Sequence, residues 1–114
     1  MDVLRAAWIP LLVSSFVACG GAPAPGPTVA KDGFTIDAEL WRGDEAVIVN
    51  RASFELACPK DQVATHVLAA ARHARSLSDV VMRAAQVGVD ACGKRAVYVY
   101  LSQQGQWVMN TARE

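Results

Sequence analysis

The stretch AVYVYL, residues 96–101, is the clearest β-strand signal in the chain. Tyrosine and valine both favour strands, and they make up four of its six residues. The segment SQQGQ, residues 102–106, has loop composition, and WVM, residues 107–109, predicts a returning strand. We therefore predict a C-terminal β-hairpin.

Two shorter segments precede this hairpin. The segment VGV, residues 87–89, predicts a short extended stretch, and CGKR, residues 92–95, has the composition of a tight corner. Further upstream, residues 52–58, ASFELAC, alternate apolar and polar side chains, as a half-buried strand does. In such a strand Phe54 and Cys58 share the inward face.

The segment FTIDAEL, residues 34–40, also alternates and predicts a strand. Turn chemistry follows in WRGDE, residues 41–45, and AVIV, residues 46–49, completes an expected hairpin. An amphipathic helix over residues 37–50 competes with this hairpin, because Gly43 is the only strong helix breaker in the segment.

Residues 62–86 are ambiguous. Alanine and arginine are good helix formers, so propensity favours a helix over residues 61–75. The alternative is a strand over residues 62–68 that leads into a long irregular hairpin loop.

The first 18 residues, MDVLRAAWIPLLVSSFVA, predict an export signal. Arg5 precedes 13 uncharged residues, which as a helix would span about 20 Å of a bilayer core about 30 Å thick. The run is therefore too short for an ordinary transmembrane helix. Pro10 argues against the other interpretation, a buried N-terminal helix of the domain.

The residues Val17, Ala18 and Cys19 resemble a bacterial lipobox, although Phe16 stands where leucine is usual. At such a site the signal is removed and the cysteine sulfur carries a diacylglycerol, which anchors the protein to a membrane. Gly20 follows in place of an inner-membrane-retaining Asp, so we expect outer-membrane anchoring, with secretion after ordinary cleavage as the alternative.

A linker follows the expected lipidation site. Residues 19–30 contain the cysteine and the uncharged segment GGAPAPGPTVA, which cannot bury enough apolar surface to fold. We expect residues 31–114 to form one small domain in the cell envelope, with an envelope partner that the sequence does not identify. Nucleic acid is not an expected partner, because 11 basic and 11 acidic residues balance.

The chain has three cysteines, Cys19, Cys58 and Cys92. If Cys19 takes the lipid, the other two remain as a pair, and in an oxidising compartment such a pair most often forms a disulfide. That bridge would stabilise the domain by about 3–4 kcal/mol in the chain-entropy model. A metal site or a redox pair is the alternative, but CxxC spacing is absent and His66 and His73 are lone histidines.

The aromatic residues allow two interpretations. Trp41, Tyr98, Tyr100 and Trp107, with Arg95 beside them, would form an exposed binding surface, or alternate members would fill the core of a thin sheet. We favour the core interpretation. The sequence contains no recognisable catalytic constellation, and we expect no metal and no cofactor.

Two cysteine-containing motifs carry a resemblance. The pattern F-x-L-x-C-P-x-x-Q, then G-V-x-x-C-G-x-R-A-x-Y, then a tryptophan and an asparagine, is similar to a family of small predicted bacterial lipoproteins of myxobacterial type. The matching residues are Phe54, Cys58, Pro59, Gln62, Gly88, Cys92, Gly93, Arg95, Ala96, Tyr98, Trp107 and Asn110. The resemblance covers about half the chain and implies a domain and a compartment, with no activity. It favours a strand over residues 62–68, with residues 69–86 as a longer insertion.

Together these patterns predict a mainly β fold: a small antiparallel sheet of four to five strands, at most one or two helices, and one disulfide. An α+β domain with a helix in residues 61–75 is the alternative. The expected function is that of an exported cell-envelope lipoprotein acting as a non-enzymatic binding or structural module. The alternative is an envelope redox or metal-binding protein that uses Cys58 and Cys92.

Overall fold

A computed structural model describes residues 26–113 of the chain. The expected export signal, the lipidation site at Cys19 and most of the expected linker lie outside these residues. The described elements are β1 (Thr28–Lys31), β2 (Phe34–Asp37), helix α1 (Ala38–Glu55), the 3₁₀ turn η1 (Lys60–Gln62), β3 (Val63–Ser76), β4 (Asp79–Ala91), β5 (Lys94–Leu101) and β6 (Gln106–Arg113). The mainly β fold class is therefore confirmed.

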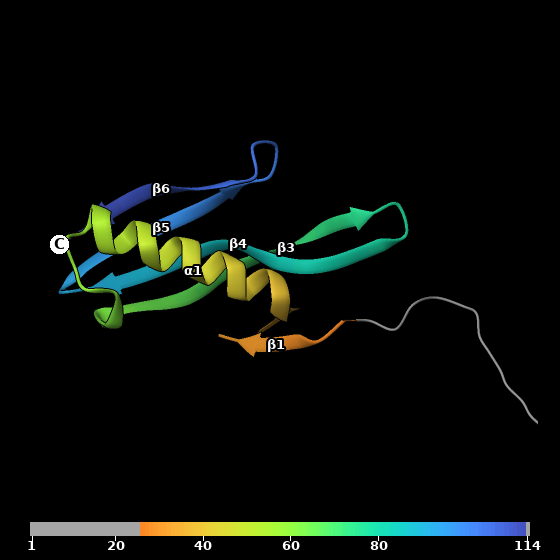
Figure 1. Cartoon of the computed structure of the whole chain (residues 1–114), viewed down its shortest axis with the longest axis horizontal. Helices are drawn as coiled ribbons and strands as arrows, with labels where there is room; N and C mark the ends of the chain where they lie inside the picture. Colours follow the sequence, from red (N-terminus) through yellow and green to blue (C-terminus); the bar gives the residue numbers. More distant parts are fainter. Residues whose placement is uncertain (1–25, 114) are drawn as a thin grey trace, which may run out of the picture.

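The strands form two antiparallel sheets. β1 pairs with β2, and the larger sheet has the strand order β3-β4-β5-β6, so within each sheet strands that are consecutive in the sequence are neighbours. Helix α1 lies across one face of the larger sheet (Figure 1). The largest fully buried side chains are Tyr98, Ile36, Ile48 and Val87. They belong to β5, β2, α1 and β4, respectively.

Two of the hairpin turns depend on left-handed backbone. Asp32 and Gly33 join β1 to β2 with φ of 53° and 87°, and Cys92 and Gly93 join β4 to β5 with φ of 53° and 79°. Two-residue turns with both φ values positive match the twist of the flanking strands. Glycine adopts this conformation without steric cost, which explains its place at the second position of each turn.

The hairpin that we predicted over residues 34–49 is wrong, since only residues 34–37 form a strand, β2, and helix α1 replaces the rest. Asp37 caps the helix, because its carboxylate accepts a hydrogen bond of 2.9 Å from the backbone N–H of Leu40. The side chains of Trp41, Ile48 and Ala52 are buried, at the spacing of one helical face. The competing prediction of a helix over residues 37–50 is thus confirmed, and the helix extends to Glu55.

The predicted strand over residues 52–58 is wrong. Most of the segment belongs to α1, and Phe54, which we predicted to face inward, has 87% of its surface exposed. The helix ends where Ala57 takes a positive φ of 52° and the N–H of Cys58 bonds the carbonyl oxygen of Ser53. Cys58 is buried, as we predicted, although a helix end and not a strand carries it there.

The region after η1 is a long two-stranded hairpin, with shifts of register between Val67 and Ala70 and between Ala74 and Ser76. The predicted strand over residues 62–68 is confirmed, and it continues to Ser76 as β3. Both the alternative helix over residues 61–75 and the irregular loop over residues 69–86 are wrong, since β4 pairs with β3 along its whole length. Pairing with β4 outweighs the helix propensity of the alanines and arginines.

The smaller hairpin packs against β3 and β4, and its turn reaches the outer edge of β3. Residues 28–30, which we assigned to the linker, belong to β1. In the β1–β2 turn, the Asp32 carboxylate accepts a hydrogen bond of 2.7 Å from the backbone N–H of Val67. This contact covers part of an edge that would otherwise present free N–H groups. No helix in residues 26–113 is long and apolar enough to span a bilayer.

Candidate functional site

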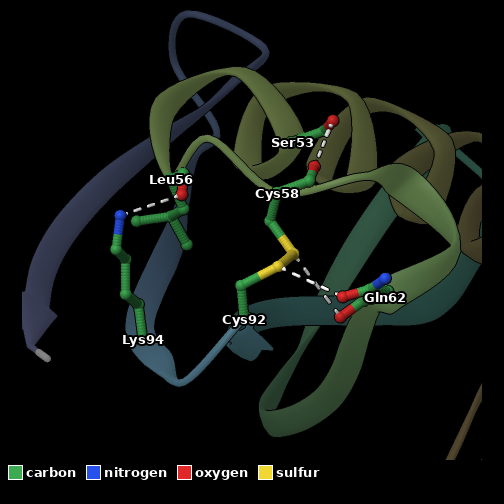
Figure 2. Close-up of a disulfide and its surroundings, with 6 residues drawn as sticks. All are labelled: Ser53, Leu56, Cys58, Gln62, Cys92 and Lys94. Atoms are coloured by element: carbon green, nitrogen blue, oxygen red, sulfur yellow. Dashed lines mark hydrogen bonds between the residues drawn. A yellow bond between two sulfur atoms is a disulfide. The ribbon is translucent and has the colours of Figure 1, made fainter.

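The disulfide between Cys58 and Cys92 joins the end of α1 to the β4–β5 turn, with 5.7 Å between the Cα atoms. The Ser53 hydroxyl donates a hydrogen bond of 2.6 Å to the carbonyl oxygen of Cys58, and the Lys94 ammonium donates one of 3.2 Å to that of Leu56 (Figure 2). These two hydrogen bonds stabilise the segments that the disulfide joins. The predicted disulfide is confirmed.

The surroundings of the bridge are polar on one side. The side-chain oxygen of Gln62 lies 3.4 Å from the sulfur of Cys92, and its backbone oxygen lies 3.8 Å from that of Cys58 (Figure 2). Bridged sulfurs carry no proton, so these are close contacts and not hydrogen bonds. Cys58 is 3% exposed, whereas Cys92 lies at the surface.

The residues that we considered as an aromatic binding surface do not form one. Trp41, Tyr98 and Trp107 are buried in the core, which confirms the core interpretation for these three. Tyr100 is half-buried, and Arg95 is exposed. The Tyr98 hydroxyl donates a hydrogen bond of 2.7 Å to Glu55 on α1, and burial raises the pKa of this hydroxyl far above its ordinary value.

Two buried charges lie between α1 and the sheet, and the sequence analysis did not identify them. The Arg83 guanidinium on β4 lies 2.7 Å from the carboxylate of Asp44 on α1. The same carboxylate oxygen accepts a hydrogen bond of 3.0 Å from the indole N–H of Trp107. We had placed Asp44 in the turn of a hairpin, and that prediction is wrong, because Asp44 lies within α1.

Aromatic rings complete this cluster. The Arg83 guanidinium lies 3.7 Å from the centre of the Tyr100 ring, and the Tyr100 and Trp107 rings are 5.3 Å apart. Oδ2 of Asp44 and Nε of Arg83 have no hydrogen-bond partner among the described residues. A pocket of about 270 Å³ adjoins the cluster, and Arg51 also lines it. Because Asp44 and Arg83 already pair with each other, this pair is better suited to positioning α1 on the sheet.

A larger groove opens on the other face of the sheet. It has a volume of about 440 Å³, within the range of small-molecule sites, and crosses β3, β4 and β5. Leu68 and Val97 provide apolar surface, and Leu68 is about half exposed. Gly88 lies between them, where a Cβ atom would come within 3.2 Å of the Leu68 side chain. The absence of a side chain at this position therefore lets the Leu68 side chain pack directly over the backbone of β4.

Charged groups line one end of this groove. The His66 ring lies between two carboxylates, with Nδ1 3.6 Å from Asp32 and Nε2 3.4 Å from Asp90. Asp90 also pairs with the exposed Arg95 guanidinium at 3.0 Å. The hydrogen bond from the Val67 N–H is the main reason that the pKa of Asp32 lies below its ordinary value.

The groove combines an apolar floor with an ionic rim, an arrangement that suits the binding of a ligand. Its lining contains no serine, threonine, cysteine or lysine that a neighbouring base would activate as a nucleophile. In the part of the chain that the structure describes, no group of three or more His, Cys, Asp or Glu residues is arranged to hold a metal ion. The clue to this site in the sequence is the alternation of Ala64, His66 and Leu68, which places both His66 and Leu68 on one face of β3.

Comparison of the chain with protein-family models, curated proteins and solved structures finds no match. The resemblance of the two cysteine motifs to small bacterial lipoproteins therefore stays a prediction.

Proposed function

We propose that this chain is an exported cell-envelope lipoprotein, anchored through lipid on Cys19, whose domain is a non-enzymatic binding module. The 13-residue uncharged run, the lipobox-like residues before Cys19 and the proline-rich segment after it support the anchor. An outer-membrane location follows from the residue after the cysteine, Gly20, and secretion is the alternative.

The disulfide is compatible with a location in the cell envelope. Disulfides persist in oxidising compartments such as the bacterial periplasm and are rare in the cytosol. Burial of Cys58 at the end of α1 favours a structural bridge over a redox-active pair, because an attacking thiolate needs access to a sulfur. The alternative function is that of a redox protein. The feature that favours it is Cys92, which is exposed and therefore accessible to a thiol.

The groove on the face of the sheet opposite α1 is the observation that carries the binding function. Its apolar floor at Leu68 and Val97 would take an apolar group of a ligand or partner, and the Asp90–Arg95 pair would align polar groups at the rim. Tethering leaves this face free to meet a partner in the envelope, since the expected anchor lies at the other end of a linker.

The anchor is tested by cell fractionation of a Cys19→Ser variant. We expect the wild-type protein in the membrane fraction, with a mass that corresponds to a diacylated cysteine at its N-terminus. We expect the variant to leave that fraction or to stay uncleaved without the lipid mass. Cys92→Ser is the control, because it replaces a cysteine of the domain, breaks the disulfide there and should leave anchoring unchanged. Equal membrane retention and equal mass for wild type and Cys19→Ser would refute the anchor.

The binding surface is tested with a photo-crosslinking amino acid at Val97 in the groove. Glu39, exposed on α1, is the control position. We expect a discrete adduct from position 97 in intact cells that position 39 does not give. The same adducts from both positions, or none from position 97, would count against the groove.

A further inference from the structure

The outer end of the β3–β4 hairpin carries exposed apolar side chains. Leu77 in the turn is fully exposed, and Val80 and Met82 are 48% and 40% exposed. A single exposed apolar residue is common on protein surfaces. Three within six positions at one protruding end form an exposed apolar cluster, which is typical of a site that contacts a partner or a membrane.

Basic side chains accompany this cluster. Arg72 is exposed and lies directly opposite Met82 in the β3–β4 register, so the two side chains share a face. Arg75 follows on β3, with Nε 3.1 Å from Asp79. An apolar tip with guanidinium groups behind it is the composition that suits the boundary between acyl chains and phosphate headgroups.

The start of the described chain lies beside this end of the hairpin. A Cβ atom on Gly26 would lie 3.9 Å from Nη2 of Arg75, and Nη1 of Arg75 lies 3.5 Å from Asp37 at the end of β2. Figure 1 shows the start of β1 and the β3–β4 turn at the same end of the domain. The chain therefore enters the domain next to the apolar tip.

The expected anchor is close to this point. Cys19 precedes Gly26 by seven residues, and seven residues reach at most about 25 Å when fully extended. A bilayer that holds the lipid on Cys19 thus lies within that distance of Gly26, beside the outer end of the hairpin. Such a tether raises the effective concentration of the bilayer at the tip, so a contact that is weak by itself becomes populated.

We infer that the β3–β4 hairpin end is a second membrane contact, with Leu77 inserted among the lipid headgroups and acyl chains and Arg72 facing the phosphates. The inference rests on the proposed lipid anchor. A bilayer fits this end better than a folded protein partner, because a narrow convex turn offers far less than the roughly 1,000 Å² that a specific protein interface buries.

The test uses the full lipidated protein carrying Leu77→Trp, reconstituted into vesicles of phosphatidylethanolamine and phosphatidylglycerol. Brominated acyl chains in half of the samples quench tryptophans that reach the bilayer. The parent protein corrects for Trp41 and Trp107, both of which are buried. Lys60→Trp is the control, since β3 spans 14 residues, or about 45 Å, between η1 and the hairpin turn.

We expect blue-shifted emission and at least two-fold quenching at position 77, and neither at position 60. Unquenched emission at position 77 in protein whose lipid is verified by mass would overturn the inference while leaving the anchor intact. A blue shift without quenching would also overturn it and would indicate a protein contact. Absence of the lipid mass from the purified protein would instead refute the proposed function.

Discussion

The guanidinium of Arg83 on β4 lies 2.7 Å from the carboxylate of Asp44 on α1, and both side chains are about nine-tenths buried. This ion pair joins the helix to the sheet at residues 39 positions apart in the sequence. Trp107 and Tyr100 close around it, so water has little access to either charge.

We predict that Arg83→Ala lowers the free energy of unfolding by about 3 kcal/mol, because it leaves the Asp44 carboxylate buried without its cation. Urea denaturation measures this loss. The double variant Asp44→Leu/Arg83→Met should come within about 1 kcal/mol of wild type, since neither charge then remains buried. A loss in the double variant as large as that of Arg83→Ala would contradict this account of the pair.

We expect Cys58→Ala and Cys92→Ala to destabilise the domain by similar amounts, about 3 kcal/mol each, and the double variant to lose no more than either one. Either substitution opens the same bridge, so the second has little left to remove. Denaturation of the three variants beside wild type measures the losses, and mass spectrometry with and without reductant counts the free thiols. Additive losses would show that each cysteine contributes through packing alone.

Glycine has opposite roles at two positions. Gly93 has a φ of 79° in the β4–β5 turn, so Gly93→Ala should destabilise the domain by about 1–2 kcal/mol. Gly43 lies within α1 with open space around it, so Gly43→Ala should stabilise the domain by up to about 1 kcal/mol. Thermal denaturation of the two variants provides the comparison. A shift of the same sign in both would contradict the turn geometry.

The carboxylate of Asp32 should make stability depend on pH in the acid range. The hydrogen bond from the Val67 N–H holds its pKa in the folded state below the ordinary value of 3.8. The ionised form therefore stabilises the fold above pH 3.8, and this contribution is lost as pH falls through the lower, folded-state pKa. The variant Asp32→Asn keeps a side-chain oxygen that can accept the hydrogen bond from Val67, but it has no carboxylate that titrates.

We accordingly expect the difference in unfolding free energy between wild type and Asp32→Asn to shrink as the pH is lowered from 5 to below 3.8. Urea denaturation at a series of pH values measures it. A difference that is constant across this range would contradict the role assigned to the Val67 hydrogen bond.

The C-terminal hairpin was predictable because its strands are rich in residues that favour strands, and β5 and β6 begin and end within a few residues of the predicted segments. Asp32-Gly33 is a strong hairpin signal that the sequence analysis overlooked. Helix α1 was harder to predict because its buried face includes the charged Asp44, while apolar Val47 and Phe54 are exposed. Its pattern therefore lacks a continuous apolar stripe.

The candidate groove depends on information that local sequence does not hold. His66 and Asp90 are 24 positions apart, and only the β3–β4 register brings their side chains together at 3.4 Å. That register depends in turn on β4 pairing along an alanine-rich strand whose own propensity is helical. Tertiary pairing thus decides both the element and the site.

The disulfide encloses the whole of β3 and β4, since its two cysteines lie just before η1 and just after β4. A protease that cuts the peptide bond between Leu77 and Ser78, where both residues are exposed, would therefore release no fragment. The nicked chain would migrate as one species on a non-reducing gel and as two after reduction. For a protein exposed to proteases, the bridge thus holds the two parts of a cleaved chain together.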